Sequence, residues 1–232
     1  PPPEAPVRSL YLRAGGTLSF EPPAAGENPF DEYISDPARP VPFTDEITTD
    51  MPGSYMVGDQ RFATRRPDVL VFETEPLKED VTLAGPLTAS LMVSTTGTDS
   101  DWVVKLIDVF TDKASSPSSG GAGLVMGNYH QLIRGEPFRG KYREGMDQPK
   151  PFEPGVRTRV EWVMPDVCHT FRVGHRIQVQ VQSSWFPLID RNPQKYVPNI
   201  FEAKPEDFVK ATMRVYHDAL RPTRLEIRRL DP

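Results

Sequence analysis

The chain has 232 residues, of which 38% are hydrophobic, and it contains 26 prolines and 16 glycines. This length and composition suit one β-rich domain, and no apolar run is long enough to span a bilayer. The net charge of −5 argues against a nucleic-acid-binding protein, and a single cysteine, Cys168, excludes an internal disulfide or a cysteine metal cluster. We therefore expect no nucleic-acid partner, no membrane partner and no cofactor.

The first quarter of the chain combines a predicted hairpin with a proline-rich segment. We expect residues 1–6 to be a linker and residues 8–20 to form a β-hairpin, because paired leucines flank a Gly-Gly turn. Residues 21–53 contain seven prolines, a density that excludes a helix or a central strand. A segment of this length predicts a long loop or arm that packs on another surface.

Short segments in which apolar and polar side chains alternate occupy most of the remaining chain. The predicted strands lie at residues 68–74, 81–84, 87–93, 102–110, 129–142 (one or two strands), 156–162, 177–182, 210–215 and 225–227. A Ser/Gly-rich stretch at 113–123 predicts a mobile loop. Since no segment has helical periodicity, the pattern predicts an all-β fold, a β-sandwich of jelly-roll type with long proline-rich loops.

Two of these predicted strands carry further information. Residues 102–110 are apolar on both faces apart from Lys105 and Asp108, which indicates a central strand covered on both sides. In residues 177–182, three aliphatic side chains alternate with three glutamines, which predicts one buried face and one solvated face.

The loop that follows, residues 185–193, is the predicted functional surface. The residues that we expect at a domain interface or cleft are Trp185, Phe186, Asp190, Arg191 and Asn192. Large aromatic side chains left bare in a monomer need cover, so packing against another domain is the favoured interpretation. The aromatic pair could instead stack on a sugar or plug the end of the sandwich. Asp190 and Arg191 could pair with each other or reach a partner surface.

The sequence assigns no catalytic residue. Ser54 lies in a proline-rich loop, and Pro52 and Met56 stand where a nucleophile elbow needs glycines. The histidines are His130, His169, His175 and His217. None has zinc-binding spacing, and we expect His175 and His217 to be strand-end residues whose side chains bond to the backbone.

Asp99 and Asp101 form an acidic turn before the predicted central strand. Two carboxylates beside a serine could contribute to a Ca²⁺ site, but calcium takes six or more oxygen ligands. We favour a solvated turn in which the aspartates cap the backbone, and we assign no metal ligand.

Several motifs, taken in order, resemble one family. They are DQRFATRRPDVLVF (59–72), LAGP (83–86), TDSDWVVKLIDV (98–109), GHRI (174–177), SWFP (184–187) and DRNP (190–193). Together they resemble the non-catalytic C-terminal jelly-roll domain of the X-prolyl dipeptidyl-peptidase, cocaine esterase and α-amino acid ester hydrolase family, and the last branch is the most similar. The resemblance extends from about Leu10 to the last predicted strand.

The resemblance implies a serine hydrolase whose catalytic residues lie outside this chain. In that family the nucleophile, with its Gly-x-Ser-Tyr-x-Gly motif, belongs to an α/β-hydrolase domain, and Gly53-Ser54-Tyr55 does not reproduce this motif. The partners implied are the hydrolase and cap domains of the parent chain, with a homo-oligomer as a further possibility. The family implies acyl transfer from an ester or a peptide.

We therefore expect residues 1–232 to form a single galactose-binding-domain-like jelly roll that packs on a hydrolase domain, helps to wall its active-site cleft and is inactive alone. The alternatives are an independent carbohydrate-binding jelly roll and an oligomerisation domain. The compartment is expected to be periplasmic or extracellular if the parent carries a signal peptide, and otherwise the cytoplasm.

Overall fold

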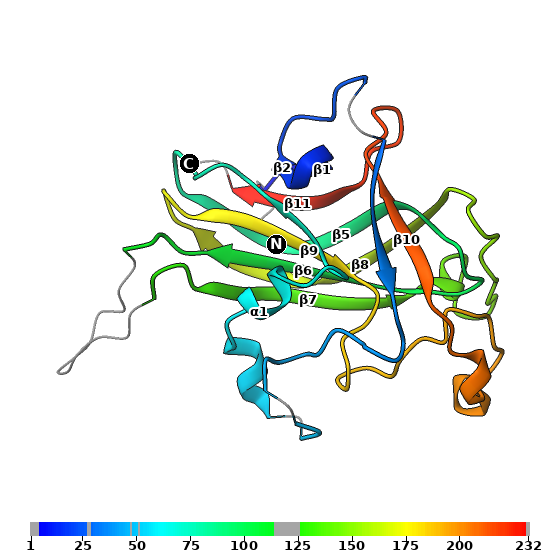
Figure 1. Cartoon of the computed structure of the whole chain (residues 1–232). Helices are drawn as coiled ribbons and strands as arrows, with labels where there is room; N and C mark the ends of the chain where they lie inside the picture. The colour runs from blue at the N-terminus through cyan, green and yellow to red at the C-terminus, as the bar shows by residue number, and fades with distance from the viewer. Residues whose placement is uncertain (1–4, 27–28, 47, 51, 114–125, 231–232) are drawn as a thin grey trace.

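The computed structural model describes residues 5–26, 29–46, 48–50, 52–113 and 126–230, and the structural statements below concern these residues. Strands dominate the described chain (Figure 1). They are β1 (Val7–Arg13), β2 (Thr17–Ser19), β3 (Phe30–Ser35), β4 (Leu70–Glu73), β5 (Val81–Thr95), β6 (Asp101–Val109), β7 (His130–Arg139), β8 (Thr158–Phe171), β9 (Arg176–Gln182), β10 (Ala211–Tyr216) and β11 (Arg224–Leu230). The helical elements are α1 (Arg61–Thr64) and the 3-10 turns η1 (Ala14–Gly16), η2 (Gly53–Val57), η3 (Gly140–Tyr142), η4 (Ile200–Glu202) and η5 (Pro205–Asp207).

The strands join in the order β3-β10-β5-β11-β1-β2-β4-β9-β6-β7, and β8 pairs with β5 beside this path. Almost all pairs are antiparallel, and the exception is the short parallel contact of β2 with β4. The path folds over so that its two halves enclose one main core, with buried side chains from β5, β8, β10 and β11 facing those from β4, β6 and β9. This arrangement is an all-β sandwich, as the sequence predicted.

Each predicted strand is present, with one merger and one extension: the strand predicted at 156–162 is β8, which continues to Phe171. The hairpin at 8–20 is present as β1 and β2, in which Leu12 pairs with Leu18. The two strands predicted at 81–84 and 87–93 are a single strand, β5, because a register shift between Gly85 and Leu87 lets the chain continue along β8. The predicted central strand is β6, and all of its residues are buried.

The proline-rich segment at 21–53 contains a strand that the sequence analysis did not predict. This strand, β3, lies between Pro29 and Pro37 and pairs only with β10, at one end of the strand order. The prolines exclude a central strand but not an edge strand, because an edge strand needs ladder partners on one side alone. The segment after β3 behaves as the predicted arm, since Val41 and Phe43 are buried against the sheet.

The three glutamines of β9 are not solvated, so the prediction of a wet face was wrong. Gln178, Gln180 and Gln182 have no exposed surface. The segment that includes α1 covers Gln178 and Gln180: Thr64 Oγ1 accepts from the side-chain amide of Gln180 at 3.1 Å and donates to Gln178 Oε1 at 3.5 Å. All three side-chain amide nitrogens find acceptors, but Oε1 of Gln180 and Oε1 of Gln182 have no partner among the described residues, so burial of this face is costly.

No helix in the described ranges is both long enough and apolar enough to cross a membrane. The mobile loop predicted at 113–123 lies almost wholly outside the described residues. Of the predicted linker, residues 1–4 also lie outside them, whereas Ala5 is buried and its carbonyl accepts a hydrogen bond from Arg228.

Candidate functional site

Trp185 lies inside the domain, which contradicts the expectation that its ring is bare. Its residue is 3% exposed and packs with Phe43 and Val103. The space for the ring exists because its neighbour on β7 is Gly135, where a Cβ atom would lie 2.6 Å from Trp185 Cη2. The sequence analysis left open whether the aromatic pair stacks on a sugar or plugs the sandwich. Trp185 is buried, so it acts as a plug, and its ring is not accessible to a sugar.

A fully buried lysine, Lys105, lies beneath this ring. Its Nζ is 5.1 Å from the centroid of Trp185 and 5.7 Å from that of Phe62, and it donates to Gln60 Oε1 at 3.2 Å. No carboxylate in the described residues forms an ion pair with it. Burial without a counter-ion disfavours the ammonium and lowers the pKa of Lys105 to about 7. The aromatic faces offset only part of that cost. We call Phe43, Val103 and Trp185, together with Lys105 and Gln60, the outer cluster.

Phe186 and Arg191 remain at the surface of the loop. Phe186 is 37% exposed. The Arg191 guanidinium lies 5.7 Å from its ring and donates to the carbonyl of Pro37 at 3.0 Å. Arg191 therefore ties the loop to the arm, and it does not pair with Asp190. Backbone hydrogen bonds between Phe186 and both Val41 and Phe43 join the same two segments.

Asn192 belongs to the interior and not to an exposed interface. It is 2% exposed, its amide donates to Asp101 Oδ1 at 2.8 Å, and its own Oδ1 accepts from the backbone of Gln194. This residue orients the loop and the buried carboxylate at once.

Asp99 and Asp101 are buried, so the prediction that this turn is solvated was wrong. Asp99 does cap the backbone as predicted, because its Oδ1 accepts from the Ser100 N–H at 2.8 Å. Burial and the nearby charge of Asp101 raise the pKa of Asp99 to about 6. Burial also raises the pKa of Asp101, while the charge and hydrogen bonds of Arg139 act in the opposite direction. Among the described residues, no cluster of three or more His, Cys, Asp or Glu side chains is arranged to hold a metal ion.

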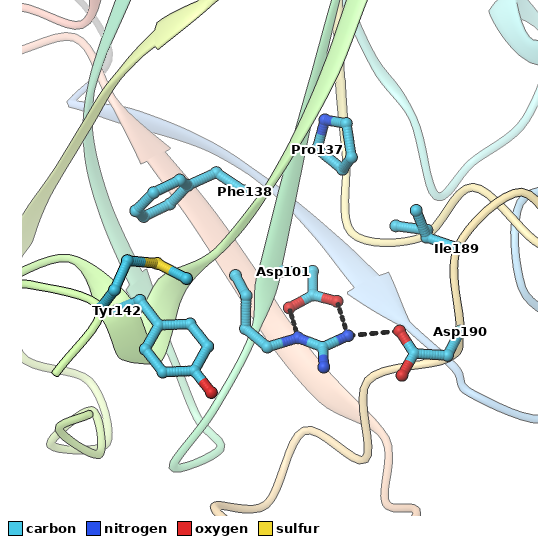
Figure 2. Close-up of a pocket in the computed structure, with 8 residues that line it drawn as sticks. Asp101, Pro137, Phe138, Tyr142, Ile189 and Asp190 are labelled. Carbon is cyan, nitrogen blue, oxygen red and sulfur yellow. Dashed lines mark hydrogen bonds and ion pairs between the residues drawn. The ribbon is translucent and has the colours of Figure 1, made fainter. Parts of the chain in front are cut away.

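Arg139 connects these buried acids to the loop (Figure 2). Its Nε and Nη2 donate to the two oxygens of Asp101 at 3.1 and 3.2 Å, and Nη2 also donates to Asp190 Oδ1. This ion-pair group lies beside a hollow of about 360 Å³, which we call the Asp190 hollow. The lining residues are Asp101, Pro137, Phe138, Arg139, Tyr142, Met146, Ile189 and Asp190.

A second hollow lies on the other side of the loop. Its volume is about 620 Å³, and Phe186 and Pro187 line it together with the arm residues Pro42, Thr44, Asp45, Glu46, Thr48 and Thr49. Residues 185–193 thus border two hollows at once. Sequence reasoning found this loop but missed Arg139 and Phe138, because their strand, β7, carries no motif that marks them.

The histidines and Ser54 do not form a nucleophilic constellation in the described residues. Ser54 is exposed in η2. The His217 ring bonds to the Leu12 carbonyl at 2.9 Å, as predicted, and also to Asp31. His175 departs from the prediction, because its ring bonds to the carboxylate of Asp108, which His169 also contacts. These pairs hold the histidines within the domain.

The geometry defines a class of protein: an all-β sandwich in which no catalytic group is assembled among the described residues. The family model for the X-Pro dipeptidyl-peptidase C-terminal non-catalytic domain matches residues 1–226. The chain belongs to this family, as a non-catalytic C-terminal domain.

Individual relatives agree with this assignment. The cocaine esterase of Rhodococcus sp. (strain MB1 Bresler) is 36% identical over 178 residues, which cover 77% of this chain and 28% of the esterase. A solved α-amino acid ester hydrolase superposes with a TM-score of 0.90 at 48% identity, covering 96% of this chain and 36% of that one. An aminopeptidase from the marine sediment archaeon Thaumarchaeota archaeon gives 0.91 at 46% identity, covering 100% and 38%. The chain therefore spans about a third of the length of these relatives.

Proposed function

We propose that residues 1–232 form a single accessory domain of a serine hydrolase, which packs on the α/β-hydrolase and cap domains and helps to wall the active-site cleft. One observation carries the proposal: the chain matches a non-catalytic C-terminal domain and corresponds to only 28 to 38% of each relative. The remaining two thirds of such a protein leave room for a catalytic domain, which supplies the partner.

The names of the relatives support a proposal for the reaction of the parent protein. Their names describe a cocaine esterase, an α-amino acid ester hydrolase and an aminopeptidase, so the bonds concerned are esters and amides. We propose acyl transfer to water through a serine acyl-enzyme, with the nucleophile, its base and its acid all outside this chain.

The docking face that we propose is built from residues 185–193 and the arm. Phe186 exposes apolar surface there, and so do Met56 and Val57 of η2, the turn at the end of the arm that contacts Trp185 through Tyr55. Covering such surface is favourable by about 25 cal/mol per Å² of apolar area. Trp185 and Asn192 contribute from beneath, because they fix the backbone of the loop from inside the domain.

The two alternative functions are an independent carbohydrate-binding module and an oligomerisation domain, and the described residues support neither. A sugar platform needs an accessible aromatic face, and Trp185 of the predicted pair is buried. No feature of the described residues favours a homo-oligomer.

An activity-based probe tests the proposal. We expect a fluorophosphonate to label the full-length protein once, on a serine outside this chain, and to leave the isolated chain unlabelled, because its described serines lack a nucleophile elbow. Chymotrypsin and heat-denatured samples serve as positive and negative controls. Stoichiometric labelling of Ser54, or of any other serine in this chain, would contradict the non-catalytic role.

A further inference from the structure

On the polar side of the Asp190 hollow, the carboxylates of Asp101 and Asp190 differ in how many hydrogen bonds they accept. Asp101 accepts two hydrogen bonds from the Arg139 guanidinium, which forms a bidentate pair at the buried end. Asp190 lies at the mouth with its side chain 45% exposed, and only its Oδ1 is bonded. Its Oδ2 has no hydrogen-bond partner among the described residues. The hollow therefore presents a carboxylate that can accept a further donor.

The opposite side of the hollow is apolar and rigid. The ring of Phe138 is stacked on Trp162, with centroids 5.2 Å apart and planes 13° apart, so its position is fixed by the main core. Tyr142 and Ile189 complete the wall. A long cationic side chain fits such a site, because its methylene stem can lie on the apolar wall while its charge reaches the carboxylate.

The rim carries apolar side chains that are almost fully bare. Met146 lines the hollow and is 76% exposed; Phe201 on η4 does not line it but is 91% exposed. The segment that leads to η4 is held near η3, because the buried Lys141 donates to the carbonyls of Val197 and Pro198. Exposed side chains of this size beside a hollow are typical of a surface that is covered in the complete protein.

From these features we propose that the Asp190 hollow receives an arginine or lysine side chain of the catalytic domain, and that Asp190 pairs with its charge. The inference rests on the proposed function, since it names a contact of that docking face. It extends the face from the arm across residues 185–193 to the hollow beyond. A carboxylate ligand is disfavoured, because Arg139, the one cation among the described residues that line the hollow, is already engaged by two aspartates.

The test uses the full-length protein and four forms of it: wild type, Asp190→Asn, Asp190→Arg and Asp166→Asn. Asp166 is the matched control, an exposed aspartate on β8 that does not line the hollow. Docking is measured as the rate of limited proteolysis at the linker between the domains and as the number of thermal unfolding transitions. Thermal melts of the isolated chain check that each variant still folds.

We expect Asp190→Asn to raise the rate of linker cleavage by about tenfold, because removing one partner of an interfacial charge pair leaves the other unpaired. Asp190→Arg should raise it further, and Asp166→Asn should match wild type. If Asp190→Arg is cleaved as slowly as wild type and the control, the inference is wrong while the proposed function stands. If wild type itself shows an unprotected linker and two independent transitions, the proposed function fails and the inference fails with it.

A second measurement distinguishes two possible occupants of the Asp190 hollow, a side chain of the catalytic domain and a small organic cation. The isolated chain is titrated with butylguanidine and followed by NMR shifts at the hollow. Binding that Asp190→Arg abolishes, together with unchanged docking in the full-length variant, would make the hollow a site for small organic cations and would overturn the interdomain contact.

Discussion

The main core and the outer cluster are both buried, but they are built from different side chains. The main core lies between the two halves of the sandwich and consists of aliphatic and aromatic residues from nearly every strand. The outer cluster lies on the far face of β6 and β9, where three buried hydrophobic residues pack beside Lys105 and Gln60, next to the buried glutamines of β9. Since only the first is apolar throughout, the two regions should differ in stability and in their response to pH.

The two regions support different parts of the molecule: the main core supports the sandwich, and the outer cluster supports the surface loop at residues 185–193. The main core holds the strands together and has no reason to respond to pH near neutrality. The outer cluster supports residues 185–193 from below, and it does so with polar groups that are costly to bury. Residues 185–193, the loop that we propose for docking, are therefore attached to the less apolar of the two clusters, where opening loses less hydrophobic contact than in the main core.

The largest expected effect comes from truncating one aromatic side chain in each region. Phe171→Ala in the main core should lower the free energy of unfolding by about 3–5 kcal/mol, as for other buried aromatic residues. Trp185→Ala in the outer cluster should cost about 2–3 kcal/mol, because the loop can settle into the space and the buried Trp185 Nε1 has no partner to lose. Urea denaturation of the isolated chain measures both. A larger loss for Trp185→Ala than for Phe171→Ala would reverse the ranking of the two regions.

The second expected effect is a dependence on pH that Lys105 confers. Because burial lowers its folded-state pKa to about 7, the unfolded chain binds more protons than the folded chain between that pH and the ordinary lysine pKa. Unfolding free energy should therefore rise with pH above 7, by at most about 1.4 kcal/mol per pH unit from this group. Lys105→Met should remove this rise and stabilise the domain at pH 7 by about 1–3 kcal/mol.

Urea titrations at pH 7, 8 and 9 distinguish the outcomes for Lys105. Lys210, which is exposed and paired with Asp36, serves as the control, and Lys210→Met should leave the slope unchanged. A wild-type slope that survives in Lys105→Met would show that another group is responsible.

The smallest expected effect concerns Asp99, whose pKa is raised to about 6. The folded chain then binds more protons than the unfolded chain between the ordinary aspartate pKa and pH 6, so this group lowers stability as pH rises through that window. Asp99→Asn should remove the decline and stabilise the domain at pH 7 by about 1–2 kcal/mol. This is less than the full linkage, because the neutral amide oxygen accepts the hydrogen bond from the Ser100 N–H more weakly than the carboxylate does.

The difference between the wild-type and Asp99→Asn curves from pH 4 to 7 isolates this group from the other carboxylates. Asp80 is a control of opposite sign, because a backbone hydrogen bond from Val173 and one from Arg172 lower its pKa. If Asp99→Asn and wild type have parallel curves, Asp99 does not titrate in this window.

Local sequence pattern was sufficient for the strands and for the class of fold. Alternation over 87–93 and 177–182 reports which residues face the main core, because a strand alternates its side chains regardless of what covers the sheet. The same pattern could not report the bulge at Gly85 or the edge strand β3. Both depend on partners, β8 and β10, that are distant in the sequence.

Only the tertiary structure decided whether the polar face of a strand is exposed to solvent or buried. The glutamines of β9 have the alternation of a solvated face, yet the segment that carries Gln60 and Thr64 lies across them. No local rule places that segment there, because the contact joins residues more than a hundred positions apart. Asp99 and Asp101 were misjudged for the same reason, since Asn192 and Arg139 arrive from other elements.

The sequence by itself determined the all-β sandwich and the family resemblance, and it supplied the hypothesis that residues 185–193 form a functional surface. Only the tertiary structure decided which side chains of that loop are available to a partner. Trp185 is buried because a glycine on β7 leaves room for its ring, whereas Phe186 and Asp190 remain at the surface. Periodicity arises within a single strand and is legible in its residues, but burial is a property of two surfaces, and the second surface is supplied by a different part of the chain.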